Sequence, residues 1–421
     1  MVRKMNGFSH KTPGKSVLLI NMFFFPDIAP TAQLAVDLAR DLIEKDYSVS
    51  VVSGRGSYLN SDSPDSLPLF ELIDGIKVYR VVSTSFMKRK KWGRMLNYLT
   101  FCFFAFLKVM SLPRHDVVIT MSTPPFISFL GIILKRVKGS RFICWVQDVY
   151  PEVAIAFGAI GEKGIFARFL KRLSLSKYRE ADRVLVIGER MFEKIREMGL
   201  DNGNFEIIHN WADPVDFELR PGEKNPIQED LGLQDKFVVL YSGNMGVVHD
   251  FKIIKSAIRE LKEDEDIIFL FVGNGVKRND LELFVRENGI ENIRFLPYQP
   301  RDKMKYTMNS GHLLLVTLDE KAAGLVVPSK MYAAMAAKRP ILGVGSKESE
   351  LWDIVSGNGC GIMVENEDSA GLVKGIRQFK ENNGVYDECA DKSAELFSKY
   401  FTRKIATEKF SGVLDNLTSR H

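Results

Sequence analysis

The chain has 421 residues, of which 45% are hydrophobic and 26% charged, and it carries a formal net charge of +5. This length exceeds what one ordinary hydrophobic core needs, so it predicts a soluble globular protein of two domains with roughly 200 residues each. The charge is only mildly basic, so anionic partners are compatible with it but nucleic acid is not implied.

The N-terminal stretch is polar and lacks the pattern of a signal peptide. An apolar run at 17–21 follows and predicts a buried first strand, and an amphipathic helix is expected at 31–46. Four cysteines lie far apart in the chain, without CxxC or metal-ligand spacing: Cys102, Cys144, Cys360 and Cys389. They favour a reduced, cytoplasmic compartment.

Short β-branched runs alternate with helical stretches through the rest of the chain. In the first half the runs lie at 47–54, 76–82, 116–121, 141–148 and 182–188. After a Pro- and Asn-rich linker the rhythm restarts, at 237–243, 267–273, 293–298, 312–318 and 341–345. This alternation predicts parallel sheets in two Rossmann-like α/β domains that meet across a cleft. We expect the first domain at 1–214, the second at 215–399, and a helix at 400–421 that packs back on the first domain.

A basic and aromatic segment at about 86–110 departs from this pattern. It begins with the cluster Lys88–Arg94 and continues with an uncharged run, Met95–Leu107, of 13 residues. Because a bilayer span needs ~20 residues, this is not a transmembrane helix. The segment is either a buried helix or an interfacial one whose basic end lies on anionic lipid.

A Pro-Ser-Lys triplet before a helix of small residues gives the clearest candidate site. Ser329 is expected to cap the helix with its hydroxyl, and Lys330 follows directly. A lysine charge at the positive end of a helix is unfavourable unless an anion offsets it, and a phosphate meets that need. The alternative is a lysine that points to solvent.

Three more loops follow strands of the second half. One carries Gly243, Asn244 and Gly246, whose glycines allow a sharp turn and a close approach to a ligand, although a mere tight turn would look the same. The next carries glycines with Lys277 and Arg278, and the last carries Glu348 and Glu350. Because strands of a parallel sheet end at one edge, we expect these loops to converge on a nucleotide diphosphate.

These motifs together resemble the retaining glycosyltransferases of family 4, which have the GT-B fold, and most closely the branch that builds bacterial surface polysaccharides. The matching pieces run in order from about residue 17 to 365 and include "MSTPPF", "WVQDVYPE", "HNWADP", "YSGNMGVVHD", "FVGNG", "RFLPYQPRDKM" and "GLVVPSKMYAAMAAKRPIL". The resemblance implies a nucleotide-sugar donor in the second domain, with UDP favoured over GDP, and a polyprenyl-diphosphate-linked saccharide as acceptor. It implies a hexosyl- or N-acetylhexosaminyl-type transferase at the inner face of the cell membrane, and thereby favours the interfacial interpretation of residues 86–110.

The resemblance also implies which side chains hold the donor. On the matching motifs these are Gly243, Asn244, Gly246, His249, Gly273, Arg278, Tyr298, Ser329 and Lys330. Many family members carry two glutamates in this region, but here the two positions hold Leu325 and Ala333, so the ribose contact is expected from Glu350. Many members also have a histidine at the end of the mid-domain strand, where this chain has Gln147 and Asp148.

Asp148 and Lys330 are the predicted catalytic residues. Lys330 and loop N–H groups would stabilise the departing diphosphate, and Asp148 would orient or deprotonate the acceptor hydroxyl. Asp148 could instead be a turn residue before Pro151, and His249 a surface histidine rather than a phosphate ligand. The single Asp-x-Asp sequence, Asp264–Asp266, precedes a strand and is expected to be a solvated turn. We therefore expect no metal ion or other cofactor.

Other functions remain open from the sequence. A sugar-nucleotide 2-epimerase or hydrolase would need no acceptor, and the missing glutamates would suit a non-catalytic nucleotide-sugar-binding partner. An NAD-dependent oxidoreductase is disfavoured, because no strand leads into an intact GxGxxG with an acidic residue ~20 residues further on.

Overall fold

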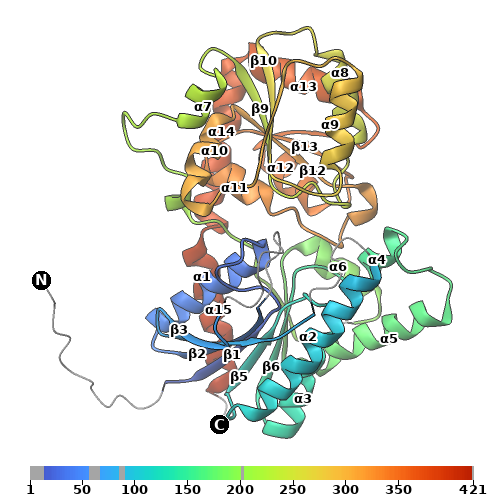
Figure 1. Cartoon of the computed structure of the whole chain (residues 1–421), viewed down its shortest axis with the longest axis vertical. Coiled ribbons are helices and arrows are strands. Elements are labelled where there is room, and N and C mark those ends of the chain that lie inside the picture. Colours follow the sequence, from blue (N-terminus) through green and yellow to red (C-terminus); the bar gives the residue numbers. More distant parts are fainter. Residues whose placement is uncertain (1–13, 56–66, 85–90, 201–202, 420–421) are drawn as a thin grey trace, which may run out of the picture. The chain divides into compact units, whose positions relative to one another are not determined.

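Two β-sheets form the framework of the computed structural model, which describes residues 14–55, 67–84, 91–200 and 203–419 (Figure 1). The first has the strand order β3-β4-β2-β1-β5-β6-β7-β8 and the second β11-β10-β9-β12-β13-β14. Strand β3 pairs antiparallel with β4, whereas the second sheet is parallel throughout its pairs. The predicted pattern of parallel α/β sheets is confirmed.

The first sheet and its helices come from the first half of the chain. The strands are β1 (Ser16–Ile20), β2 (Ser48–Gly54), β3 (Phe70–Ile73), β4 (Ile76–Val81), β5 (Val117–Thr120), β6 (Arg141–Val146), β7 (Arg183–Val186) and β8 (Phe205–Ile207). The helices are α1 (Pro30–Glu44), α2 (Lys91–Ser111), α3 (Ser128–Lys138), α4 (Glu152–Ala156), α5 (Ile165–Glu180) and α6 (Glu189–Glu197).

The second sheet repeats the strand and helix alternation. Its strands are β9 (Phe237–Ser242), β10 (Ile267–Val272), β11 (Ile293–Leu296), β12 (Leu313–Thr317), β13 (Ile341–Val344) and β14 (Gly361–Val364). The helices are α7 (Pro226–Leu231), α8 (Lys252–Glu260), α9 (Arg278–Glu287), α10 (Met304–Ser310), α11 (Lys330–Ala336), α12 (Glu350–Asn358), α13 (Ser369–Glu381), α14 (Asn383–Tyr400) and α15 (Arg403–Thr418). Short 3₁₀ turns lie at Pro214–Asp216, Arg301–Lys303 and Glu320–Ala322.

The chain divides into two compact units. Unit 1 comprises Met1–Trp145, Glu180–Arg183 and Phe410–His421, and unit 2 comprises Val146–Arg179 and Val184–Lys409. Unit 1 thus includes the end of α15, where Phe410 meets the edge of the Trp145 ring at 4.7 Å between centroids. The predicted domain limits at 214 and 399 stay predictions.

Each unit has its own apolar core. In unit 1 the inner face of α2, with Phe101, Ala105 and Val109, packs on strand residues that include Leu18 and Ile20. In unit 2, helices α8 and α13 cover apolar side chains of β9, β10 and β13. Strands such as β5, β10 and β12 are buried along their whole length, and the loops at the strand ends carry the polar residues.

Helix α2 has a second apolar face that the core does not cover. Six large side chains along it are each 40–58% exposed: Met95, Leu96, Leu99, Phe103, Phe104 and Leu107. Spacings of three to four residues place them along one stripe of the helix. The helix is therefore both a core element and a surface one, while the basic residues at 88–90 lie outside the described part of the chain.

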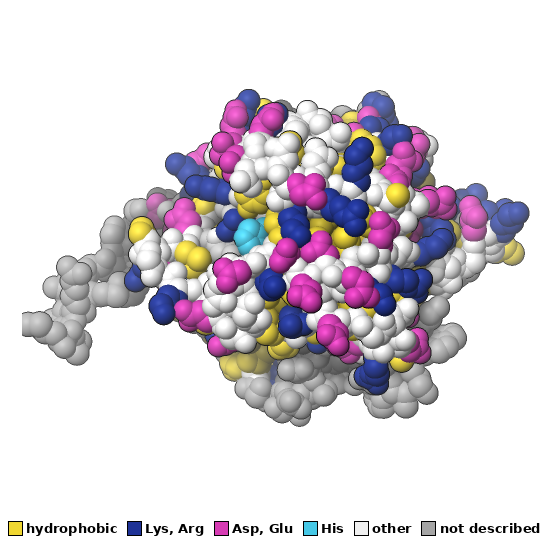
Figure 2. Space-filling model, turned by 90° about the horizontal axis from the view of Figure 1, so that it is seen from above, with side chains coloured by type: hydrophobic (Ala, Val, Ile, Leu, Met, Phe, Trp, Pro, Cys, Tyr) yellow, Lys and Arg dark blue, Asp and Glu magenta, His cyan; other side chains and the backbone are white. Residues whose placement is uncertain are grey.

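No helix in the described ranges combines the length and the apolar character that crossing a bilayer requires. On the face shown in Figure 2, acidic and basic side chains are interspersed, with apolar side chains visible between them.

Candidate functional site

Lys330 lies at the first position of α11, as the sequence predicts. Strand β12 ends at Thr317, and the connection passes through a 3₁₀ turn before the helix begins. The predicted cap is wrong: Ser329 has helical backbone angles, and its side chain makes no capping hydrogen bond. A capping side chain normally needs an extended backbone at that position, which Ser329 does not adopt.

The amino group of Lys330 contacts His249. The Nζ–Nε2 distance is 2.8 Å. On the other side of the ring, Nδ1 lies 2.6 Å from the carbonyl oxygen of Thr317, which can only accept a hydrogen bond. Nδ1 therefore carries the proton, Nε2 is the acceptor, and Lys330 donates. The amino group also lies 5.0 Å from the centre of the Tyr241 ring.

Lys330 has a positive charge that its surroundings do not neutralise. Burial lowers its pKa to about 7, because the charged form loses its hydration. Among the residues that the structure describes, no carboxylate forms an ion pair with it. Burial also lowers the pKa of His249 well below its usual value, and the neighbouring Lys330 lowers it further. An anion bound here would restore the charged form of the lysine.

Glycines let the neighbouring loops approach this amino group. Gly243 has a φ of 130°, and a Cβ atom there would lie 3.0 Å from Cε of Lys330. Gly273, with a φ of 128°, would place a Cβ 2.2 Å from the carbonyl oxygen of Gly243. Both positions need glycine for its backbone freedom and for space. Because their strands are parallel neighbours, the loops after β9 and β10 lie at one sheet edge, as predicted.

Backbone hydrogen bonds join these loops into one surface. Met245 N–H donates to Asn274, and Asp319 N–H donates to Val248, each at 2.8 Å. The loops after β9, β10 and β12 are thus held together. The region includes the predicted donor residues Asn244 and Gly246 in the first of these loops.

Two other predicted donor residues follow β10 and β11. Arg278 donates to the carbonyl oxygens of Gly273 and Leu296, and its guanidinium lies 2.7 Å from the carboxylate of Glu282. These bonds hold two strand ends together. Arg278 would have to give up some of them to contact the nucleotide-sugar donor directly. Tyr298 is half-buried and close enough to Tyr241 to raise the pKa of that phenol, after the larger effect of burial.

Asp148 lies directly after β6, where the sequence places it. Its backbone forms an antiparallel bridge with Val326, and the next residue donates to Leu325 at 3.0 Å. The bridge connects the end of β6 to the segment that leads into Lys330. Burial raises the pKa of the Asp148 carboxyl to about 6. The preceding Gln147 is buried and exchanges two amide hydrogen bonds with Asn210, at 3.1 and 2.8 Å.

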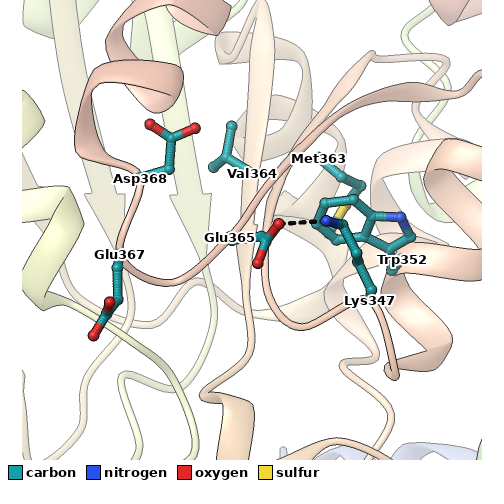
Figure 3. A pocket seen from close by; sticks show the side chains of 7 residues that line it. All are labelled: Lys347, Trp352, Met363, Val364, Glu365, Glu367 and Asp368. Atoms are coloured by element: carbon teal, nitrogen blue, oxygen red, sulfur yellow. Dashed lines mark ion pairs between the residues drawn. The ribbon is translucent and has the colours of Figure 1, made fainter.

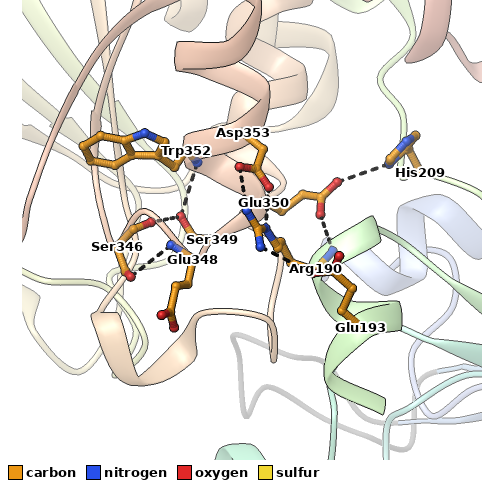
Figure 4. Close-up of polar contacts among 9 residues, drawn as sticks. All are labelled: Arg190, Glu193, His209, Ser346, Glu348, Ser349, Glu350, Trp352 and Asp353. Carbon is orange, nitrogen blue, oxygen red and sulfur yellow. Dashed lines mark hydrogen bonds and ion pairs between the residues drawn. The ribbon is translucent and has the colours of Figure 1, made fainter. Parts of the chain in front are cut away.

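Glu350 contacts the start of a helix, and its predicted contact with the ribose stays a prediction. Its carboxylate is 4% exposed and accepts a hydrogen bond from the backbone N–H of Arg190 at 3.0 Å (Figure 4). A second backbone N–H, from Glu189, also donates to it. Residue Gly188 precedes α6 and has no side chain to cap it, and a Cβ there would come within 2.5 Å of the carboxylate. Glu350 therefore caps α6 from a distant part of the chain.

Further polar contacts surround this carboxylate. The Arg190 guanidinium makes a two-pronged contact with Asp353, at 2.5 and 3.1 Å (Figure 4). The Nδ1 atom of His209 lies 4.0 Å from Glu350 but donates to the carbonyl of Ile187 at 3.0 Å. Despite the two backbone donors, burial raises the pKa of Glu350 to about 7. Arg190 and His209 were not predicted here, because their contacts with Glu350 join residues 160 and 141 positions apart.

A pocket of about 660 Å³ opens between α12 and the end of β14, apart from the predicted site residues. Its lining is drawn in Figure 3: Lys347, Trp352, Met363, Val364, Glu365, Glu367 and Asp368. The lysine is paired with Glu365 at 2.6 Å. Three carboxylates against one lysine disfavour a diphosphate, so this pocket is not the candidate donor site.

Comparison with known proteins agrees with this geometry. The family model "Glycosyl transferases group 1" matches residues 223–396, and "Glycosyltransferase Family 4" matches residues 31–216. The "Probable glycosyltransferase WbjE" of Pseudomonas aeruginosa is 28% identical over 73% of this chain and 76% of its own length. This chain is a glycosyltransferase with the GT-B fold.

Two further likenesses extend the comparison. The "Putative colanic acid biosynthesis glycosyl transferase WcaI" of Escherichia coli is 27% identical to the glycosyltransferase described here, over 72% of this chain and 76% of the relative. Among solved structures, Anabaena Alr3699/HepE in complex with UDP and glucose has a TM-score of 0.72 at 14% identity, covering 96% of this chain and 100% of that one. At 14% identity, the likeness to HepE concerns the fold alone.

The buried Glu350 predicts a pH-dependent stability that Glu350→Gln should remove. The folded-state pKa, about 7, lies above the ordinary value of 4.5, so the native state holds a proton that the unfolded state has lost. The wild type should therefore lose stability as the pH rises from about 4.5 through 7. Relative to it, Glu350→Gln should gain on the order of 3 kcal/mol in free energy of unfolding between pH 5 and pH 8.

Urea denaturation at several pH values measures this difference. The control is Glu348→Gln, which removes an exposed carboxylate two residues away and should leave the pH dependence of the wild type intact. Parallel stability curves for wild type and Glu350→Gln would show that Glu350 is ionised in the folded state at no extra cost.

Proposed function

We propose that this glycosyltransferase moves a sugar, of hexosyl or N-acetylhexosaminyl type, from a nucleotide-sugar donor to a saccharide on a polyprenyl diphosphate lipid. The transfer retains the anomeric configuration and serves the biosynthesis of a bacterial surface polysaccharide such as O-antigen, capsule or exopolysaccharide. UDP is favoured over GDP as the donor nucleotide. The similarity to WcaI, a putative glycosyltransferase of colanic acid biosynthesis, and the UDP bound by HepE support this proposal.

The observation that carries the proposal is the amino group of Lys330. It lies at a sheet edge where glycines admit a ligand, it contacts neutral His249, and burial lowers its pKa to about 7. A diphosphate at this position would pair with the ammonium form and accept hydrogen bonds from loop N–H groups. The same contacts would stabilise the diphosphate as it leaves the sugar, so the proposed reaction requires no metal ion.

Asp148 supplies the acceptor half of the proposal. Its raised pKa, about 6, keeps it ionised at neutral pH but close enough to that pH to exchange a proton with a hydroxyl. In the proposed reaction it orients the acceptor hydroxyl or takes its proton. The backbone bridge to Val326 supports this role, because it keeps Asp148 near the segment that carries Lys330.

The exposed stripe of α2 supports contact with the membrane in which a polyprenyl acceptor resides. Its six exposed apolar side chains suit insertion into the headgroup region. The basic residues that precede them in the sequence suit anionic lipid. We therefore place the enzyme on the inner face of the cell membrane as a peripheral protein.

Replacing Lys330 with alanine should weaken UDP binding at least tenfold. A charge-assisted hydrogen bond contributes on the order of 1.5–3 kcal/mol. At pH 8 the free lysine is largely neutral, so UDP binding to the wild type should take up about one proton. Titration calorimetry in buffers of different ionisation enthalpy measures both quantities. The exposed Lys321→Ala is the matched control and should behave as wild type; unchanged UDP affinity in Lys330→Ala would remove the lysine from the donor site.

Replacing Asp148 with asparagine should lower kcat by about 10²–10⁴-fold, because the amide cannot take a proton. The affinity for UDP should stay within about a few-fold, since the donor contacts come from other loops. The wild-type rate should fall as the pH drops below about 6, where the carboxyl becomes protonated. Exposed Glu162→Gln serves as the charge-matched control. Near-normal turnover of Asp148→Asn would exclude this role.

Membrane binding should depend on both the apolar and the basic parts of the α2 segment. Leu99→Ser, Phe103→Ser and Leu107→Ser combined should release the protein from vesicles, and so should glutamine at Lys88, Arg89, Lys90 and Lys91, at roughly 1 kcal/mol for each charge. Flotation with phosphatidylcholine vesicles, with and without phosphatidylglycerol, measures both effects. The exposed Val137→Ser on α3 is the control. Equal binding of all variants would mean that α2 does not contact lipid.

A further inference from the structure

The first turns of α5 carry exposed apolar side chains on one face. Ile165 is 79% exposed and Phe169 57% exposed. Because they are four residues apart, both side chains lie on the same side of the helix. Ile165 also begins the helix, so its side chain lies at the very end of this element. Large apolar side chains this exposed, next to each other, are typical of an interaction surface.

The opposite side of α5 holds the helix in unit 2. Ala167 is fully buried and Leu170 is 6% exposed. Further along, Ser174 donates a hydrogen bond to the backbone carbonyl of Tyr150 at 2.6 Å. The exposed side chains are therefore presented by an anchored helix rather than by a loose loop.

Positive charge surrounds the exposed pair. Residues 161–176 contain four basic side chains and one acidic residue: Lys163, Arg168, Lys171 and Arg172, against Glu162. Lys163, Arg168 and Arg172 are exposed. The first turn of α5 contains no acidic residue, so the positive end of the helix dipole is not offset there.

We propose that the N-terminal half of α5 is a second lipid-binding surface, which inserts Ile165 and Phe169 into an anionic membrane while its basic residues contact lipid headgroups. The proposal extends the membrane contact of the proposed function but concerns a separate element from α2. Two exposed apolar side chains fall short of the roughly 800 Å² per partner that a stable protein interface buries. Apolar side chains flanked by arginine and lysine suit the boundary between headgroups and acyl chains.

The test uses the full chain and vesicles of phosphatidylcholine, with and without phosphatidylglycerol. Ile165→Ser with Phe169→Ser removes the apolar part, and Arg168→Gln with Arg172→Gln removes charge. Each pair should reduce the apparent affinity for anionic vesicles at least about tenfold. Val215→Ser, which removes a 75% exposed apolar side chain elsewhere in unit 2, should leave it unchanged.

The possible outcomes distinguish lipid binding by α5 from lipid binding by α2, from self-association and from the proposed activity. Wild-type vesicle affinity in the Ile165/Phe169 pair would overturn the proposal, whatever the α2 variants do. So would a change of oligomeric state by light scattering with unchanged vesicle binding, which would assign the face to a second copy of the chain. Turnover of a short-chain, detergent-soluble acceptor should be normal in the α5 variants. If the wild type itself fails to transfer sugar, the proposed function fails, while the vesicle measurements still decide the role of α5.

Discussion

A half-buried amino group that has no carboxylate partner in the described part of the chain is the constraint on which the candidate site depends. Lys330 is held at the start of α11, where the helix dipole already disfavours positive charge. The protein limits the cost in three ways: His249 is kept as a neutral acceptor by Thr317, the Tyr241 ring faces the amine, and the lysine can lose its proton near neutral pH. A group arranged in this way is poorly suited to stabilise the empty protein and well suited to bind an anion.

Glu350 is also a buried ionisable group, but it caps a helix instead of offering a site for an anion. Its buried carboxylate lies at the positive end of α6, where the backbone N–H groups of Glu189 and Arg190 stabilise negative charge. The lack of a side chain at Gly188 makes room for it. The loop after β13 is therefore tied to the start of α6 by one ionisable group. The raised pKa of Glu350 means that burial disfavours the charged form more than the two backbone N–H groups favour it.

Much of the fold could be predicted from the sequence, because buried parallel strands are short apolar runs between amphipathic helices. The three strands that were not predicted are only partly buried: β3 is exposed at alternate positions, β8 has three half-buried residues, and β14 has three half-buried residues before Val364. In the site, the residues around Lys330 predicted that it lies at the start of a helix. The family resemblance indicated which loops hold the donor. The predicted cap by Ser329 was wrong because tertiary contacts, and not the local sequence, determine the backbone angles of this residue. The partners of Glu350 and Arg278 depend on contacts between distant segments, which a single sequence does not encode locally.

The short bridge between Asp148 and Val326 links the two halves of the proposed chemistry. In a transfer that retains configuration, the attacking hydroxyl and the leaving diphosphate lie on the same face of the sugar, so the groups that serve them must be close and fixed. Val326 is four residues before Lys330, and it pairs with the residue that would position the hydroxyl. Backbone pairing fixes this proximity more firmly than flexible side chains could, and positioning of this kind accounts for a large share of enzymatic rate enhancement. A change in this backbone segment would therefore disturb both functions together, whereas a change in either side chain alone should disturb one of them.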